Sequence, residues 1–465
     1  MMTARKRNIV ITLGSFSFIT AIAGTSVTLA LPRIGTTFHV GSAVATLALQ
    51  VGLITAIIFL VLFGHSGDIF SKSLVFKYGG WIFTAGTLFT GLAPSFALLL
   101  GGRVIQAIGI AMIMANTMGI INEFFDDQER AAVLAYNSMF ISVGAIMGPA
   151  LGGIITSVLS WRWTFLIFVP FSLVTMWLGD HNLPTLKLNR QIVIKEIKAS
   201  NWLGQALFTV GIITIFMSQF MSLPGLSQIE NYFFWLVLGG IITLSSFVQD
   251  SRAKSPWIAP IILKNRTFMA SVFVLFIMMF VNSISNILLP FYFQDFLGFS
   301  AGKSGLLVAT QSLVVMSMSP FIGRFANNKQ RRLRLTAIGL TILTLAQIGY
   351  ILYDGTPNVL LLGLPIVANG IGMGLAMTPN NALTMSFVGN QLAGVGGSMN
   401  SLFRNLGIAL GTSFATSMLY TQLPGVKVIS SSLGRLYLSA SANVFIIGMI
   451  MAAFGIILNF VRPKD

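Results

Sequence analysis

Few ionisable side chains lie inside the long apolar stretches of this chain, and those few could do chemistry there. Arg103 and Arg404 each interrupt an apolar run, while Glu123 and Asp295 stand at the ends of two others. Ionisable groups in an apolar medium are costly and usually functional. A partly buried carboxyl group suits reversible proton binding, because loss of solvent raises its pKa toward neutrality. We therefore take Asp295, then Glu123, together with Arg103, as candidates for proton coupling.

The sequence contains no pattern typical of an enzyme. His, Asp and Glu do not cluster in the sequence, so we expect no catalytic residues and no metal site. The chain has 0 Cys, which excludes disulfides, thiolate metal sites and cysteine nucleophiles but leaves the redox compartment open. A phosphate-binding loop of the GxxxxGK[ST] type is missing, so neither ATP nor another cofactor is expected.

Composition predicts that the chain spans a membrane. Hydrophobic residues make up 55% of the sequence and charged residues 9%, with a mean hydropathy of +0.85. Soluble domains carry about 25% charged residues. Apolar runs of roughly 20 residues, the length that crosses a bilayer, recur fourteen times, near 9–31, 42–63, 77–96, 98–121, 132–158, 163–179, 202–222, 233–249, 268–292, 302–322, 335–352, 358–380, 396–420 and 439–461.

The positive charge fits loops at one face of a membrane better than a nucleic-acid surface. The net charge is +16, and of the 28 Lys and Arg residues 21 fall at one face if the spans alternate, against 5 at the other. Such an excess marks the cytoplasmic face. We therefore expect a multi-pass protein of the cell membrane with both termini cytoplasmic. The basic Arg5–Arg7 segment precedes a retained first span rather than a cleaved signal peptide, because no small-residue cleavage site follows it.

A repeated motif indicates an internal duplication. The pattern Asn-Ser-x-Phe-x-x-x-Gly-x-x-x-Gly occurs at 137–148 and again at 400–411, 263 residues later. The predicted fold is an all-α integral membrane protein of two pseudo-symmetric six-helix bundles plus an inserted two-helix hairpin, giving 14 transmembrane helices. The expected parts are 1–185, a linker helix with the hairpin at 186–255, and 256–465. Duplicated bundles around a site near the membrane midplane are typical of alternating-access carriers.

Glycines in the first copy predict a close helix contact. Gly144, Gly148 and Gly152 recur every four residues, with Gly153 beside them, so one helix face carries no side chains and a neighbouring backbone can approach. Pro149 removes one backbone hydrogen bond and bends the helix.

Several motifs together resemble the major facilitator superfamily, specifically its fourteen-span drug:proton antiporter branch. They are Gly144-x-x-x-Gly148-Pro149-x-x-Gly152-Gly153, Arg103-x-x-Gln106-x-x-Gly109, Gly64-x-x-x-Asp68-x-x-x-Lys72, Trp161-Arg162-Trp163-x-Phe165 and Asn201-Trp202-Leu203-Gly204. The resemblance runs over nearly the whole chain and implies export against protons. It also implies that Asp68 and Lys72, with Arg130, form a latch at the cytoplasmic side. The chain departs from the family pattern at Ile69, Ser71 and Ser73, at Ala23, where an Asp is frequent, and at Thr28, where an Asn is frequent.

Polar side chains within spans are candidates for lining a substrate cavity. They are Thr28, Gln106, Asn116, Asn137, Asn282, Asn286, Asn369, Asn400 and Arg404. Amides with aromatic and Met side chains favour amphipathic organic molecules. Because no carboxylate stands at mid-span, we expect neutral, zwitterionic or monocationic compounds. The expected partners are this small molecule, protons and the lipid bilayer, for a protein that is monomeric and binds no nucleic acid.

Alternatives remain within and outside transport. The chain could be a dedicated exporter of one metabolite or of tetracycline, which a broad substrate screen would distinguish. A membrane enzyme would need clustered catalytic side chains at one face. A channel or sensor would lack glycine-lined duplicated halves and would often carry a soluble domain.

Overall fold

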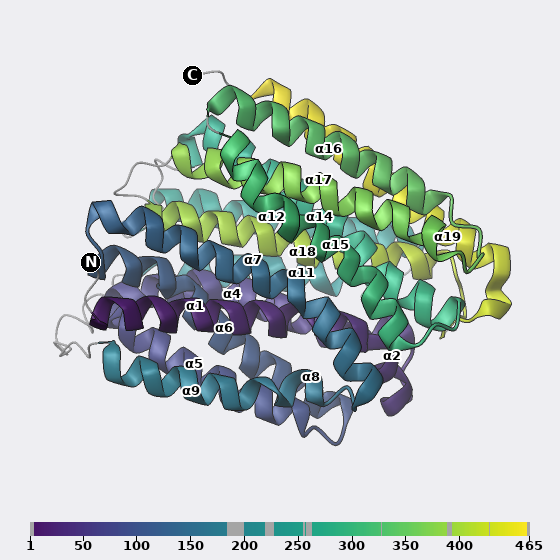
Figure 1. Cartoon of the computed structure of the whole chain (residues 1–465), viewed down its shortest axis with the longest axis horizontal. Helices are drawn as coiled ribbons and strands as arrows, with labels where there is room; N and C mark the ends of the chain where they lie inside the picture. The colour runs from purple at the N-terminus through teal and green to yellow at the C-terminus, as the bar shows by residue number, and fades with distance from the viewer. Residues whose placement is uncertain are drawn as a thin grey trace.

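The computed structural model describes residues 4–183, 200–218, 227–253, 256, 263–326, 328–387, 393–426 and 428–462. Within these ranges every regular element is helical. The long helices run side by side along the longest axis of the molecule, and both chain ends lie toward the same end of the bundle (Figure 1). The predicted linker helix falls largely at 184–199, outside the described residues.

The helices follow one another with short connections. They are α1 (Ala4–Thr25), α2 (Val27–Phe38), α3 (Ser42–Ala45), α4 (Leu47–Phe70), α5 (Lys72–Gly91), α6 (Phe96–Phe124), α7 (Asp127–Val158), α8 (Trp163–Leu166), α9 (Phe168–Asn182), α11 (Trp202–Met217), α12 (Gln228–Arg252), α14 (Arg266–Phe291), the π-helix η1 (Tyr292–Phe296), α15 (Ala301–Phe325), α16 (Lys329–Ile351), α17 (Val359–Ser386), α18 (Ala393–Thr421), the 3-10 helix η3 (Ser431–Leu433) and α19 (Gly434–Val461).

Local sequence explains where several helices begin. The side-chain oxygens of Ser95, Asn201 and Asn265 each accept a hydrogen bond from a backbone N–H three residues later. Ser227 and Glu230 form a reciprocal capping box at the start of α12. Such caps satisfy N–H groups that have no partner within the helix. Pro290 lies in the last turn of α14, and the chain passes directly into η1 after it.

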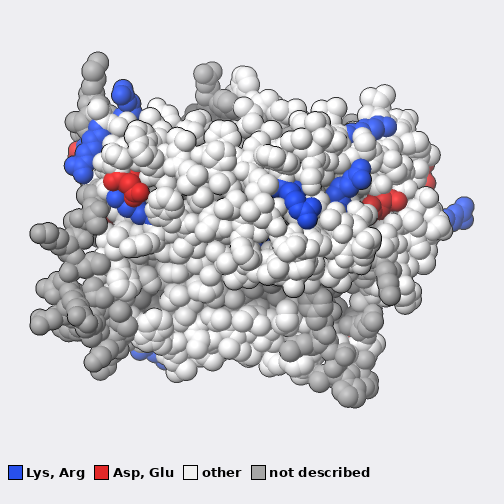
Figure 2. All heavy atoms as spheres, turned by 90° about the horizontal axis from the view of Figure 1, so that it is seen from below, with Lys and Arg blue, Asp and Glu red and all other residues white. Residues whose placement is uncertain are grey.

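Nine helices in the described part of the chain are long and apolar enough to cross a membrane. One more, α11, is apolar but spans only Trp202–Met217. The all-helical membrane fold is therefore confirmed, while the count of fourteen spans stays a prediction. A space-filling view agrees with a membrane protein, because a band almost free of charged side chains separates a charged group at one end of that face from the charged side chains of its other half (Figure 2).

The contact between α5 and α6 recurs between α16 and α17. A Cβ added to Gly109 would lie 2.6 Å from the carbonyl oxygen of Gly79, and one added to Gly372 would lie 2.8 Å from that of Gly339. Real Cβ atoms do not approach backbone oxygens so closely, so all four positions need glycine. The same two-glycine contact thus holds one helix pair in each repeat.

The repeated motif of the sequence also makes equivalent contacts. A Cβ on Gly144 of α7 would lie 2.5 Å from the carbonyl oxygen of Phe18 in α1. A Cβ on Gly407 of α18 would lie 2.5 Å from that of Phe276 in α14. The glycine spacing therefore sets the α1–α7 and α14–α18 contacts alike. The side chain of Pro149 lies outside the description, although α7 continues through it.

Valine at Gly372 should destabilise the fold, whereas valine at Gly363 of the same helix should not. The first side chain would press on the backbone of α16, and such overpacking typically costs about 1–3 kcal/mol. A Cβ at Gly363 would meet no atom within 4 Å. Thermal unfolding of the two purified variants measures the difference, and equal midpoints would show that the α16–α17 contact is not tight.

Two contacts connect the repeats at opposite ends of the bundle. Near the end of α7, a Cβ on Gly153 would lie 2.6 Å from the Cα of Gly305 in α15. Toward the end that holds the N-terminus, α4 packs against α18, and Ile57, Met399 and Phe403 share a buried cluster there.

Helices α11 and α12 pack along each other, and Gln205 of α11 donates a hydrogen bond of 3.2 Å to the Ile58 carbonyl of α4.

Candidate functional site

A cavity of about 250 Å³ lies between the two repeats. Helices of both contribute to it: α1, α2, α4, α6 and α7 from the first, and α14, α15, α17 and α18 from the second. Of the predicted cavity residues, the lining includes Thr28, Asn282, Asn286 and Arg404, and it also includes Arg103. The space is slightly smaller than typical ligand pockets of about 300–1,000 Å³, so it suits a small organic molecule.

Arg103 is held at the cavity wall by neutral acceptors. Its Nε donates to the carbonyl oxygen of Ala48 at 2.8 Å, and its Nη1 donates to Oε1 of Gln106. Gln106 in turn donates through Nε2 to Thr87 Oγ1 at 2.9 Å. The guanidinium also lies over the Phe165 ring, 5.7 Å from its centroid. Gln106 therefore positions Arg103 and does not line the cavity itself.

Gly52 of α4 leaves space for the side chain of Arg103, which lies on α6. A Cβ at that position would lie 2.6 Å from Nη2 of Arg103. We did not single out Gly52 from the sequence, and no local signal marks it, because the requirement comes from a side chain on another helix.

Arg404 enters the same cavity from α18. Its side chain is half-buried, and among the described residues it has neither a hydrogen bond nor an ion pair. Asn405, Ile408 and Thr412 of the same helix also line the cavity. Of these four residues only Arg404 was predicted to line the cavity, although the spacing of Arg404, Ile408 and Thr412 by four residues places them on one helix face.

Three amides meet at the cavity on α14, α15 and α17. Oδ1 of Asn282 accepts a hydrogen bond from Gln311 Nε2 at 2.6 Å and a longer one from Asn369 Nδ2 at 3.4 Å. Asn369 also donates to Ser285 Oγ at 3.1 Å. Asn282 and Gln311 line the cavity, so this network of α14, α15 and α17 offers polar groups to a bound molecule.

The other predicted amides lie in helix contacts. Asn116 donates to the carbonyl oxygens of Phe63 at 3.1 Å and Met112 at 2.9 Å. Oδ1 of Asn137 accepts from Ser17 Oγ at 2.7 Å, and Ser17 is itself part of the cavity wall. Nδ2 of Asn400 donates to Asn381 Oδ1 at 3.4 Å.

The two candidate carboxylates lie away from the cavity lining. Asp295 is half-buried in η1, with Arg33 as the charge acting on it, and no ion pair or hydrogen bond of the described residues reaches its carboxylate. The charge of Asp295 also acts on the side chains of Tyr420 and Tyr437. Glu123, in contrast, accepts from Lys72 Nζ at 2.9 Å.

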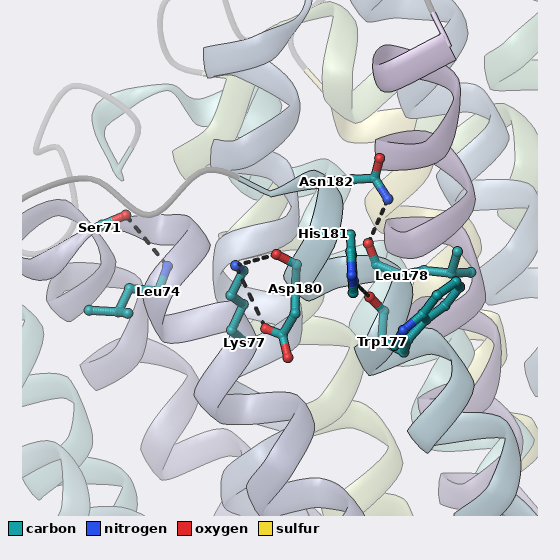
Figure 3. A network of polar contacts seen from close by, with 8 residues as sticks. All are labelled: Ser71, Leu74, Lys77, Trp177, Leu178, Asp180, His181 and Asn182. Carbon is teal, nitrogen blue, oxygen red and sulfur yellow. Dashed lines mark hydrogen bonds and ion pairs between the residues drawn. The ribbon is translucent and has the colours of Figure 1, made fainter.

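The predicted latch can be described only at Lys72, because the side chains of Asp68 and Arg130 lie outside the description. Ser71, one of the positions that depart from the family pattern, has φ 147°, in the region that favours glycine. Its Oγ accepts from the N–H of Leu74 and caps α5 (Figure 3). Ser71 thus keeps a glycine-like turn and offsets part of its strain with a hydrogen bond.

Polar contacts between Lys77 of α5 and Asp180 of α9 connect these two helices near Ser71. Lys77 Nζ lies 3.7 Å from the Asp180 carboxylate and donates to its carbonyl oxygen at 3.3 Å (Figure 3). The side chains of His181 and Asn182 bond to backbone oxygens of their own helix, at Trp177 and Leu178 (Figure 3), and Oδ1 of Asn182 also accepts from Asn8 of α1 at 3.1 Å. These contacts hold the helix ends and lie apart from the cavity.

Comparison with known proteins agrees with this architecture. Residues 11–412 match the Major Facilitator Superfamily. The chain is 24% identical over 455 residues to "Riboflavin transporter RibZ" of Clostridioides difficile (strain 630), with 96% of each chain covered. It is 25% identical to "Lincomycin resistance protein LmrB" of Listeria monocytogenes, covering 81% of this chain and 80% of that one.

A solved structure shares the fold. A bacterial homolog of the human lysosomal transporter Spinster superposes with a TM-score of 0.63 at 18% identity, covering 99% of this chain and 98% of that chain. The family match, the similarity to a riboflavin transporter and the cavity between repeated helix bundles agree, and the chain belongs to the major facilitator superfamily as a membrane transporter rather than an enzyme.

Proposed function

We propose that the protein exports amphipathic organic compounds from the cytoplasm by alternating access, driven by the proton gradient and without a cofactor. The single observation that carries this proposal is the cavity between the repeats, whose lining is apolar apart from a few amides, hydroxyls and two arginines. Met114, Met279, Met373 and Met377 add adaptable apolar surface to it. A carrier needs such a site near the membrane midplane, reached from each side in turn.

The protein lies in the cell membrane as a monomer of fourteen spans with both termini cytoplasmic, in the fourteen-span drug:proton antiporter branch. Helices α11 and α12, which pack along each other, are the inserted hairpin. Export is supported by the glycine pattern of α7 and by the resistance named for one relative.

Dye uptake by inverted vesicles tests the function, with one anionic and one cationic amphipathic dye assayed in parallel. Vesicles containing the protein should accumulate at least one of the dyes when a proton gradient is applied, and an uncoupler should abolish accumulation. Vesicles from cells without the protein are the control. Accumulation that persists with the uncoupler would rule out proton drive.

A dedicated carrier of one metabolite is the second candidate, and one observation favours it. The relative with 96% coverage is named for riboflavin transport alone. A screen of chemically unrelated toxic compounds in cells with and without the protein distinguishes the two. Resistance confined to one chemical type would favour the dedicated carrier.

Asp295 should carry the coupled proton, so Asp295→Asn should make efflux nearly independent of pH. A carboxyl group that binds and releases a proton in each cycle makes the rate depend on pH, and an amide cannot. Glu123→Gln is the matched control: Glu123 is half-exposed and paired with Lys72, and such surface pairs contribute little. We expect the control to retain its pH profile. If only Glu123→Gln flattened the profile, Glu123 would be the proton carrier.

A further inference from the structure

The cavity carries positive charge that the protein does not balance. Arg103 and Arg404 both line it, and none of its described lining residues is Asp or Glu. The acceptors of Arg103 are a backbone carbonyl and an amide oxygen, which are both neutral. Arg404 has no hydrogen-bond partner among the described residues. The largely apolar cavity therefore holds two guanidinium groups, and no carboxylate of the described lining neutralises them.

Such an arrangement is energetically costly unless something compensates it. A charge that is partly or fully removed from water is normally paired, because an unpaired charge is strongly disfavoured there. A guanidinium offers five N–H donors in a planar fork that matches carboxylate, sulfonate and phosphate oxygens. An anionic group on the transported molecule would supply the missing acceptors, and the low polarity around it would strengthen the attraction.

We propose that the compounds this protein exports are amphipathic organic anions, or zwitterions that present an anionic group to Arg404. The oxyanion group pairs with Arg404, Arg103 adds positive potential from across the cavity, and the apolar body packs on the methionines. This inference rests on the proposed export function and deepens it by naming the substrate's charge. The sequence predicted neutral, zwitterionic or monocationic substrates, and an anion-binding cavity excludes the monocations from that set.

Two dyes with the same xanthene skeleton provide the test. Fluorescein is an anion at pH 8 and rhodamine 123 is a cation, and the binding of each to the purified full-length protein in neutral detergent can be measured by fluorescence anisotropy. We expect fluorescein to bind at least about tenfold more tightly. Arg404→Gln should weaken fluorescein binding about tenfold, the size of one hydrogen bond to a charged group, and should leave rhodamine 123 binding unweakened.

Two further variants make the result specific. Arg435→Gln removes an exposed arginine outside the cavity and should change neither affinity. Arg404→Lys keeps the charge and should retain preference for fluorescein. If Arg404→Gln does not fold, the preference of the unmodified protein between the two dyes still decides the question.

The outcomes separate this inference from the proposed function. Tighter binding of rhodamine 123, or an equal loss of both dyes in Arg404→Gln, would overturn the anion assignment while leaving an export cavity in place. Failure to bind either dye would overturn both, since the cavity would then not accept amphipathic molecules. Selective loss of fluorescein supports both.

Discussion

A double variant, Ser157→Cys with Gly302→Cys, is expected to lose all transport on oxidation and to regain it on reduction. A Cβ at Gly302 of α15 would lie 3.1 Å from the Cβ of Ser157 in α7. Disulfides need about 3.5–4.5 Å between Cβ atoms, so a small shift suffices to form the bond. The chain has 0 Cys of its own, so no other thiol can compete.

The effect should be complete because α7 and α15 belong to different repeats. Alternating access requires the repeats to separate at one end while they close at the other. A covalent bond between Ser157→Cys and Gly302→Cys would prevent separation at the end away from the chain termini. The measurement is dye efflux from proteoliposomes treated with oxidant, then with reductant.

Single variants are the controls for this experiment. Ser157→Cys alone and Gly302→Cys alone should transport at the same rate in oxidant and in reductant. Undiminished transport by the double variant, with the crosslink verified by mass spectrometry, would mean that the repeats do not part at this end. Rocking of the two bundles would then be the wrong mechanism.

Replacing Arg103 should have the second-largest effect, and Lys should not rescue it. In Arg103→Gln and in Arg103→Lys we expect efflux to fall by at least about tenfold. The planar guanidinium reaches Ala48 with Nε and Gln106 with Nη1 at once, and a single ammonium cannot reproduce that fork. Leaving those buried acceptors without donors costs about 1–3 kcal/mol each.

Two measurements distinguish a transport defect from a folding defect. The thermal unfolding midpoint reports the lost hydrogen bonds, and efflux by the protein that remains folded reports what the guanidinium contributes to transport. Arg334→Gln, at an exposed arginine of α16, is the control and should change neither quantity. Full efflux by Arg103→Lys would show that the charge matters and the fork geometry does not.

The glycine motifs were the most informative part of the sequence. Their repeat at 263 residues predicted a duplicated bundle, and the contacts of Gly144 and Gly407 are indeed equivalent. Glycine spacing can be interpreted without a structure because a helix face without side chains has few uses other than close packing. Membership of the major facilitator superfamily was likewise predicted and is confirmed. The narrower drug:proton antiporter branch remains a prediction.

The direction of polar side chains was much harder to predict. Asn282 and Asn116 are both amides in membrane helices, yet Asn282 lines the cavity and Asn116 bonds to backbone within the α4–α6 contact. Glu123 was a proton candidate by position, and the structure places it in an ion pair with Lys72. Each outcome depends on a side chain from another helix, which no local pattern contains.

The sequence by itself determined that this protein is a duplicated helical membrane transporter, because apolar composition and glycine periodicity act along one chain and need no knowledge of neighbours. Only the tertiary structure decided that Arg103 and Arg404, 301 residues apart in the sequence, share one cavity whose described lining holds no carboxylate. The physical reason is that membrane helices are apolar on nearly every side. Their periodicity therefore does not tell which face meets lipid, another helix or the substrate.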